Sequence, residues 1–329
     1  MRANPAALRI KNLRATRFLA YATRDMESRV IIPVGVGLVY RYKGTIARRN
    51  IMNATDSADP VVPVPIPIQV PAKEGMAQLP DTRLGYWDTA SAGDPILLLH
   101  PASGSALIWL YQQPVFAEAG YRVIAYSRRN YYNSDPAPAD HPGAASEDLQ
   151  NLTEYLGLEK FHIVSSAAGG SVAADYALSH PERLLSLTVS SNNLAAANGY
   201  IAEAAKTMHL KEWDDLPRWF RELGPSYRAA NSAGVAKWTE LNEISETGKG
   251  ARQKLLNVVT PERLAMLKVR TLLMTGAADM FTPPSIMRMI ARHVPDNDLV
   301  IVPECGHSPY WEQPEFFNRT VLDFIGQRG

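Results

Sequence analysis

Short apolar runs alternate with helical segments from residue 75 to the end of the chain, and this alternation limits the fold more than any other feature of the sequence. The run Pro95–His100 is apolar up to its last residue, as expected of a strand buried on both faces of a parallel sheet. Further strands are predicted at residues 82–89, 121–127, 160–165, 184–191, 269–276 and 298–302, and helices at residues 106–119, 147–156, 171–180, 284–294 and 313–325. This alternation predicts an α/β fold with a doubly wound, mostly parallel sheet.

One block interrupts the alternation. Residues 193–268 contain no convincing strand, and several helices rich in Trp, Arg and Glu are predicted there. We therefore expect residues 75–192 and 269–329 to form the core, and residues 193–268 to form an inserted helical cap.

Residues 1–74 precede the regular pattern. We predict a poorly ordered leader, followed by a Pro-rich extended linker at residues 61–71. The leader matches a signal peptide poorly, because basic residues are scattered through it and its apolar stretch contains Pro33, Gly35 and Gly37. We expect a cytoplasmic protein, with secretion through an atypical leader as the open alternative.

Charge and cysteine content narrow the class of ligand. The 34 Lys and Arg residues nearly balance the 33 Asp and Glu residues, so no broad field attracts nucleic acid or an anionic membrane. The single cysteine, Cys305, excludes an intrachain disulfide and a CxxC metal site. No apolar run approaches the roughly 20 residues of a membrane helix. We expect a small, largely uncharged substrate, no nucleic acid and no membrane span; the oligomeric state is open, and a homodimer is compatible with the sequence.

Four segments that follow predicted strands hold residues suited to catalysis. Small residues fill the segment Ser165–Gly170 and end the segment Leu98–Gly104, while Asp279 and His307 lie in the other two segments. A carboxylate held against an imidazole fixes its tautomer and stabilises the imidazolium. Each feature alone has an ordinary explanation, since an Asp after a strand often caps the next helix and Gly-His is common in loops. Together, in this order, they indicate an active site.

The chain resembles the α/β-hydrolase superfamily over residues 75–329, because these segments follow the family's order and spacing. The family places G-x-S-x-G at the strand–turn–helix; here Ser165 and Gly169 take the glycine positions and Ala167 takes the position of the nucleophile. The resemblance implies that Asp279 orients His307 as the general base. It also implies that the backbone N–H groups of Ala102 and Ala168 form the oxyanion hole. We expect neither a cofactor nor a metal ion.

Alanine at position 167 has no group that attacks a carbonyl, so it cannot form an acyl-enzyme. Three explanations are open: an engineered replacement of serine, a natural enzyme in which His307 activates water or takes a substrate proton, or a non-catalytic small-molecule-binding descendant. Using Ser166 instead would misplace the two glycines. Cys305 is close to His307 in sequence, but we interpret it as a small buried hydrophobe.

Several side chains near the motifs are candidates for substrate contact, although packing is the ordinary role of any single aromatic residue. They are His100, Ser103, Trp109, Ser166, Phe281 and Tyr310. Arg128 and Arg129 follow a strand end and are candidates for a carboxylate contact, with a solvated pair of arginines as the default interpretation.

The C-terminal run Cys305–Asn318 and the segment Thr260–Leu264 also resemble the bacterial C–C bond hydrolases of aromatic catabolism. Similar runs occur in esterases, lactonases and epoxide hydrolases, and the chain departs from all of them at residue 167. We predict a cofactor-independent hydrolase of a small, mostly apolar ester, lactone or related carbonyl compound. The alternatives are C–C bond hydrolysis, a proton-abstracting lyase reaction and a non-catalytic ligand-binding protein.

Overall fold

The computed structural model describes residues 39–41, 61–194, 200–207, 211–245, 247 and 250–327. Most of the predicted leader lies outside the described residues. Within the described residues, no helix is long and apolar enough to cross a membrane.

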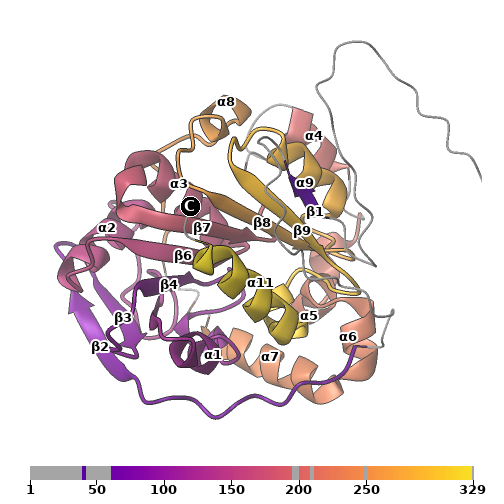
Figure 1. The fold of residues 1–329 in the computed structure, drawn as a ribbon, viewed down its shortest axis with the longest axis horizontal. Coiled ribbons are helices and arrows are strands. Elements are labelled where there is room, and N and C mark those ends of the chain that lie inside the picture. Colours follow the sequence, from indigo (N-terminus) through magenta and orange to yellow (C-terminus); the bar gives the residue numbers. More distant parts are fainter. Residues whose placement is uncertain are drawn as a thin grey trace, which may run out of the picture. The chain divides into compact units, whose positions relative to one another are not determined.

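Nine strands of the described chain form one sheet in the order β1-β9-β8-β7-β6-β4-β5-β3-β2 (Figure 1). Strands β4 to β9 run parallel to one another, whereas β1, β2 and β3 pair with their neighbours in the antiparallel sense. The strands are β1 (Val39–Arg41), β2 (Lys73–Gln78), β3 (Arg83–Asp88), β4 (Pro95–Leu99), β5 (Arg122–Tyr126), β6 (Phe161–Ser166), β7 (Leu184–Ser190), β8 (Thr271–Gly276) and β9 (Asn297–Val302). The predicted α/β class with a mostly parallel sheet is confirmed.

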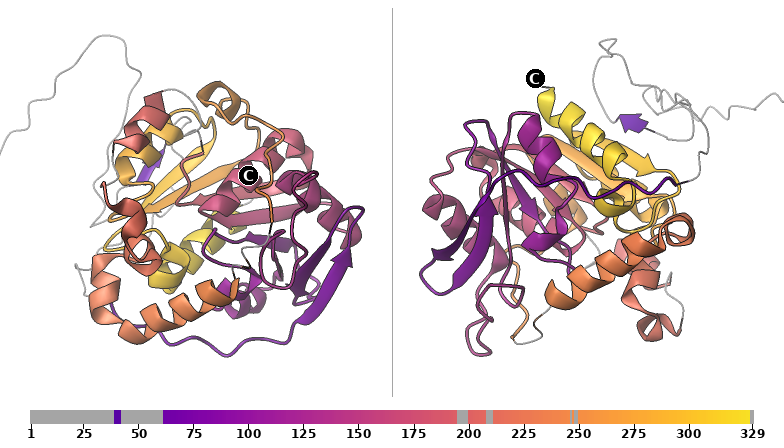
Figure 2. Two further views of the ribbon diagram at one scale, coloured as in Figure 1. Left: turned by 180° about the vertical axis from the view of Figure 1, so that it is seen from behind. Right: turned by 90° about the horizontal axis from the view of Figure 1, so that it is seen from below.

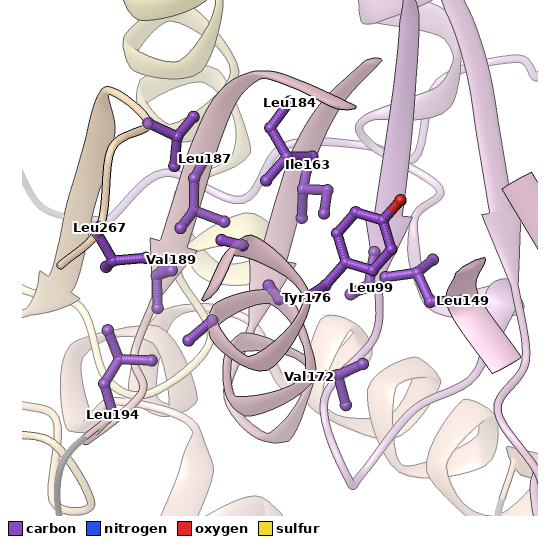
Figure 3. Packing of buried hydrophobic residues seen from close by; sticks show 14 of the residues in the cluster. Leu99, Leu149, Ile163, Val172, Tyr176, Leu184, Leu187, Val189, Leu194 and Leu267 are labelled. Carbon is purple, nitrogen blue, oxygen red and sulfur yellow. The ribbon is translucent and has the colours of Figure 1, made fainter. Parts of the chain in front are cut away.

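Helices cover both faces of the sheet. They are η1 (Ala106–Ile108), α1 (Gln113–Glu118), α2 (Ala145–Tyr155), α3 (Ala168–Ser179), η2 (Pro181–Arg183), α8 (Pro261–Leu264), α9 (Pro284–Ala291), α10 (Pro309–Glu312) and α11 (Pro314–Gly326). Leu97 and Leu99 of β4 belong to the apolar cluster that includes α2, α3 and α9 (Figure 3). Ile96 and Leu98 belong to the opposite cluster, with α1 and α11. The continuously apolar run is therefore explained by a strand that is buried on both faces.

Between β7 and β8, the residues that the structure describes form helices joined by loops. The helices there are α4 (Tyr200–Lys206), η3 (Trp213–Asp215), α5 (Arg218–Glu222), α6 (Pro225–Ala230) and α7 (Ser232–Ser245), followed by α8. Helices α5 to α7 gather at one side of the sheet (Figure 2). Buried Tyr227, Trp238 and Leu241 of these helices, and Leu223 directly after α5, join the same apolar cluster as α1 and α11.

The described part of the predicted linker has no regular structure up to β2, but it contacts the core. The Tyr111 hydroxyl donates to the Val64 carbonyl at 2.8 Å. The amide of Gln113 bonds both backbone groups of Val70, accepting from its N–H at 3.0 Å and donating to its carbonyl at 2.8 Å. This segment leads into β2, an antiparallel partner of β3 that the sequence pattern does not predict.

The predicted helix at residues 106–119 is wrong as a single element. The structure has the short η1, a break at Trp109–Gln112, and then α1. Pro114 lies in the first turn of α1, where the N–H that proline lacks has no intrahelical partner in any case. A proline there starts a new helix more easily than it continues an old one.

Candidate active site

The turn between β6 and α3 is the sharpest feature of the site. Ala167 has φ 45° and ψ −120°, and α3 begins at the next residue, three positions before the predicted start. The Ala167 N–H donates to the Ser190 carbonyl at 2.9 Å, and Asn192 Nδ2 donates to the Ala167 carbonyl at 2.5 Å. A Cβ at Gly169 would lie 2.3 Å from the Leu99 carbonyl oxygen, so a glycine is required there. The turn has the tight strand–helix geometry of a nucleophile elbow with a methyl group at its tip.

Two backbone N–H groups at the predicted oxyanion hole have no acceptor among the described residues. One belongs to Ala168, the first residue of α3, where the helix N-terminus carries partial positive charge. The other belongs to Ala102, an exposed residue in the loop after β4. Both loops follow the carboxyl ends of neighbouring parallel strands, so they meet at one edge of the sheet.

Asp279 and His307 follow β8 and β9 and are in direct contact. The ring nitrogen Nδ1 of His307 lies 2.9 Å from each carboxylate oxygen of Asp279. The Asp279 carboxylate also accepts from the N–H groups of Phe281 and Thr282 at 2.8 and 2.9 Å, and from the Thr275 hydroxyl at 2.9 Å. Asp279 thus orders its own loop while it contacts the imidazole, and the first helical residue after it is Pro284.

Burial and charge act in opposite directions on this pair. Burial disfavours both charged forms; the mutual attraction and the hydrogen bonds outweigh it, so the pKa of His307 lies above its ordinary value and that of Asp279 below. No hydrogen bond to the other ring nitrogen of His307, Nε2, is found among the described residues. An imidazole held at Nδ1 with Nε2 unbonded has the arrangement that a general base requires.

His100, a predicted substrate contact, is fully buried and both its ring nitrogens are used inside the protein. Nδ1 lies 2.7 Å from the Pro101 carbonyl, so Nδ1 is the donor and Nε2 accepts from the Arg128 N–H at 3.0 Å. Burial and the Arg128 charge hold the pKa of His100 well below its ordinary value, which keeps the ring neutral. His100 therefore supports the loop that carries Ala102.

The two arginines after β5 are not a solvated pair. Arg128 donates to the His100 and Pro101 carbonyls at 3.1 and 3.2 Å and lies over the Tyr131 ring. Arg129 is buried in a two-contact ion pair with Asp148 at 2.7 and 2.8 Å. The default interpretation as a solvated pair of arginines is wrong, because both guanidinium groups bond to other parts of the core.

The remaining predicted contact residues divide into two groups. Ser103, Trp109, Ser166 and Tyr310 are buried, whereas Phe281 is partly exposed. The centroid of the Phe281 ring lies 4.5 Å from that of the His307 ring and 4.9 Å from that of Trp213 in η3. The helical block and the core therefore meet beside the imidazole.

Neither Ser166 nor Cys305 has the surroundings of a replacement nucleophile. Ser166 is completely buried, and its hydroxyl has no partner among the described residues. Burial and the neighbouring Glu312 carboxylate raise the pKa of the Cys305 thiol well above its ordinary value. A buried thiol kept protonated is a poor nucleophile, which agrees with the prediction of a small buried hydrophobe. Among the described residues, no group of three or more His, Cys, Asp or Glu side chains suits a metal ion.

Sequence reasoning missed two buried glutamates that surround His307. Glu222 of α5 accepts from the Ser103 hydroxyl at 2.5 Å, and its backbone carbonyl accepts from the His307 N–H at 2.7 Å. Glu312 of α10 accepts from three backbone N–H groups, those of Gly224, Gly306 and Ser308, at 2.7, 2.9 and 3.0 Å. Glu312 lies five residues after His307 in the sequence, and this closeness is a weak indication that it belongs to the site. No sequence pattern indicates Glu222.

A model of the alpha/beta hydrolase family matches residues 96–320. A 2-hydroxy-6-oxononadienedioate/2-hydroxy-6-oxononatrienedioate hydrolase of Burkholderia vietnamiensis is 26% identical over 268 residues, which cover 74% of this chain and 91% of that protein. A 2-hydroxy-6-oxo-6-phenylhexa-2,4-dienoate hydrolase of Comamonas testosteroni is also 26% identical, with the same coverage.

Solved structures show the same fold. A thermophilic esterase from Thermogutta terrifontis superposes with a TM-score of 0.65 at 22% identity, covering 78% of this chain and 99% of that one. The enol-lactonase from Burkholderia xenovorans gives 0.62 at 17% identity, covering 77% and 100%. The family match spans most of the chain and includes the turn at Ala167 as well as Asp279 and His307, so this protein belongs to the alpha/beta hydrolase family.

Proposed function

We propose that this protein is a cofactor-independent hydrolase in which His307 activates a water molecule to attack a small ester or lactone. One observation carries the proposal: Nδ1 of His307 is held by both oxygens of Asp279, while Nε2 has no partner among the described residues. The unbonded N–H groups of Ala102 and Ala168 at the same edge of the sheet support it.

The chemistry needs no covalent intermediate. Water approaches where a serine hydroxyl at position 167 would project and passes a proton to His307 Nε2 as its oxygen attacks the carbonyl carbon. The carbonyl oxygen becomes negative and accepts from the Ala102 and Ala168 N–H groups. Asp279 stabilises the imidazolium, which then gives its proton to the departing alkoxide, so that an acid and an alcohol leave.

The cap completes the site in this proposal. We infer that the described part of the cap covers the carboxyl edge of the sheet, because Trp213 packs on Phe281 and Glu222 accepts hydrogen bonds from Ser103 and from the His307 N–H. The Phe281 ring beside His307 gives one wall of the site an apolar character, which suits a mostly apolar substrate.

Turnover of a panel of p-nitrophenyl esters and lactones tests the proposal. We expect slow turnover by this chain and a loss of about 10²–10⁴-fold for His307→Ala, the usual contribution of a positioned general base. His141→Ala, at an exposed loop histidine, is the matched control and leaves the rate unchanged. If the Ala167→Ser variant turns over the esters with a burst of product and the unmodified chain does not, the water mechanism is rejected in favour of a serine hydrolase.

C–C bond hydrolysis is the second candidate. The names of relatives that align over about nine-tenths of their length favour it. A 2-hydroxy-6-oxo-dienoate in the same assay separates the two candidates, because its cleavage without any ester turnover would support the second and exclude the first.

A further inference from the structure

The loop that carries Ala102 is held on both sides of this residue. Before it, the Pro101 carbonyl accepts from the Arg128 guanidinium of the core at 3.2 Å. After it, the Ser103 carbonyl accepts from Asn242 Nδ2 at 2.9 Å. Ala102 itself makes no hydrogen bond among the described residues. The direction of its N–H therefore depends on the bonds that its two neighbours make.

The contacts on the second side come from the cap. Glu222, the last residue of α5, accepts from the Ser103 hydroxyl through Oε2 at 2.5 Å. Asn242 and Ser245 belong to α7, and Ser245 donates to the Ser105 hydroxyl at 2.8 Å. Two helices of the cap thus bond to three polar groups of the loop, namely the carbonyl and hydroxyl of Ser103 and the hydroxyl of Ser105.

Most of these contacts are shielded from water. Glu222, Ser103, Ser105 and Ser245 are buried, and Asn242 is partly exposed. A hydrogen bond to a buried carboxylate is stronger than one between neutral groups, and breaking it leaves a buried group unsatisfied. The cap contacts are therefore strong enough to fix the conformation of the loop.

We propose that Glu222 and Asn242 are positioning residues, which hold the Ala102 N–H where the carbonyl oxygen of the substrate becomes negative. Both act through Ser103. The inference rests on the proposed function, which assigns the Ala102 N–H to the oxyanion hole. It adds that the hole is fixed by the cap as well as by the core.

The proposal predicts an effect on the transition state more than on binding. A donor that is already in place stabilises the developing charge without reorganisation, and loss of one such donor lowers kcat by about 10²–10³-fold. A loop that loosens keeps part of this effect, so we expect a loss of about 10-fold when one anchor is removed. The neutral carbonyl of the bound substrate depends less on the hole, so KM should change little.

Steady-state kinetics with the fastest ester of the p-nitrophenyl panel measures this difference. Glu222→Ala and Asn242→Ala should each lower kcat by about 10-fold with little change in KM. The rates are compared above the midpoint of the pH profile, where His307 is neutral, because the Glu222 charge also raises the pKa of His307. Glu243→Ala, at an exposed glutamate next to Asn242 in α7, is the matched control and should change neither constant.

A double-mutant cycle tests whether Glu222 acts through the Ser103 hydroxyl. Ser103→Ala should lower kcat as much as Glu222→Ala does, and the double variant should lose no more than either, because all three break the same bond. Glu222→Gln keeps an acceptor oxygen for Ser103, so it should lose less kcat than Glu222→Ala. Independent, additive losses would overturn the route through Ser103.

The motion of the Ala102 amide tests the inference without turnover. Its NMR order parameter should lie near the rigid value of about 0.85 in the parent chain and fall toward about 0.6 in Glu222→Ala and Asn242→Ala. The amide of Ala168, at the start of α3, should stay rigid in both variants. If Glu222→Ala does not fold, Asn242→Ala decides the result, because Asn242 is only partly buried.

The outcomes separate this inference from the proposed function. An Ala102 amide that stays rigid in the alanine variants, or that loosens equally in Glu243→Ala, would overturn the positioning role. So would parental kcat in Glu222→Ala and Asn242→Ala, or a rise in KM without loss of kcat, and either result leaves the proposed hydrolysis intact. A loosened Ala102 amide in a chain that turns over no ester would support the positioning role and overturn the proposed hydrolysis.

Discussion

Ala167 has a backbone conformation in which a Cβ is strained. Its φ of 45° and ψ of −120° are imposed by the direct passage from β6 into α3. Such outliers cost about 1–3 kcal/mol when the residue is not glycine. We expect Ala167→Gly to raise the free energy of unfolding by about 1 kcal/mol in urea denaturation. Ala236→Gly, at an exposed site inside α7, is the opposite control and should lower it by about 1 kcal/mol. A less stable Ala167→Gly would contradict this view of the turn.

The Asp279–His307 pair predicts how activity depends on pH. His307 accepts a proton only when it is neutral, and its pKa is raised. The rate should therefore rise with pH, with a midpoint above the ordinary histidine value of about 6.5. Asp279→Asn removes the larger of the charges that oppose the effect of burial on the imidazole pKa and leaves the smaller ones of Glu222 and Glu312.

We expect the midpoint to fall in Asp279→Asn, together with a loss of rate of about 10²–10⁴-fold. The pH profile of kcat/KM measures this change. Titration of the imidazole by NMR separates it from the ionisation of Glu312, whose pKa burial raises to about 7. An unchanged imidazole pKa would show that Asp279 does not control the base.

At the scale of elements, Glu312 fastens α10, the His307 loop and the cap together. Its two oxygens accept from N–H groups on both sides of His307 and from Gly224 between α5 and α6. A glutamine side chain at this position has one acceptor oxygen, and its NH2 group faces a backbone N–H donor that it cannot accept from. We expect Glu312→Gln to lower the free energy of unfolding by about 1–3 kcal/mol, the cost of a buried unsatisfied donor.

Because Glu312 holds the loop that carries His307, we expect a second effect of Glu312→Gln. The loop loosens around His307 without losing substrate contacts, so kcat should fall with little change in KM. Steady-state kinetics and thermal unfolding measure both effects. Glu315→Gln, at an exposed residue of α11, should stay within about 0.5 kcal/mol of the parent. A larger rise in KM than fall in kcat would assign Glu312 to substrate binding instead.

The strands that could be predicted are those whose apolar sequence pattern results from burial in the sheet. The run in β4 and the stretches that became β6, β7 and β8 lie in the sheet interior, and their apolar character marks them. β2 is half-exposed and less apolar, so its pattern is weak. The early start of α3 depends on one strained residue, Ala167, that propensity does not reveal.

The same distinction holds for the site. Asp279 and His307 follow strands, and the order of the strands brings them together. Glu222 is 119 positions from Ser103 in sequence, and the two meet because the cap packs on the core. His100 has the position of a substrate contact, but its bonds to Pro101 and Arg128 become visible only in three dimensions.

At the scale of the whole molecule, Asp175 of α3 fastens the chain that returns from the cap to the core. It is fully buried, and its carboxylate accepts from the backbone N–H groups of Leu256 and Asn257 at 2.9 and 2.8 Å. The Asn257 amide and the Ser146 hydroxyl of α2 add bonds at 2.7 and 2.6 Å. One side chain thus joins two core helices to the segment that precedes α8.

Asp175→Asn should release this returning segment without changing the chemistry of the site. The new amide nitrogen must face either the two groups of Asn257 or the Leu256 N–H and Ser146, so at least one buried donor loses its acceptor. The free energy of unfolding should fall by about 1–3 kcal/mol, with Asp140→Asn in an exposed loop as the neutral control. Hydrogen exchange should accelerate at Leu256 and Asn257 well before it does in β6 and β7, because local opening requires less free energy than global unfolding. Equal acceleration throughout the sheet would mean that Asp175 stabilises the core as a whole and does not specifically hold the end of the cap.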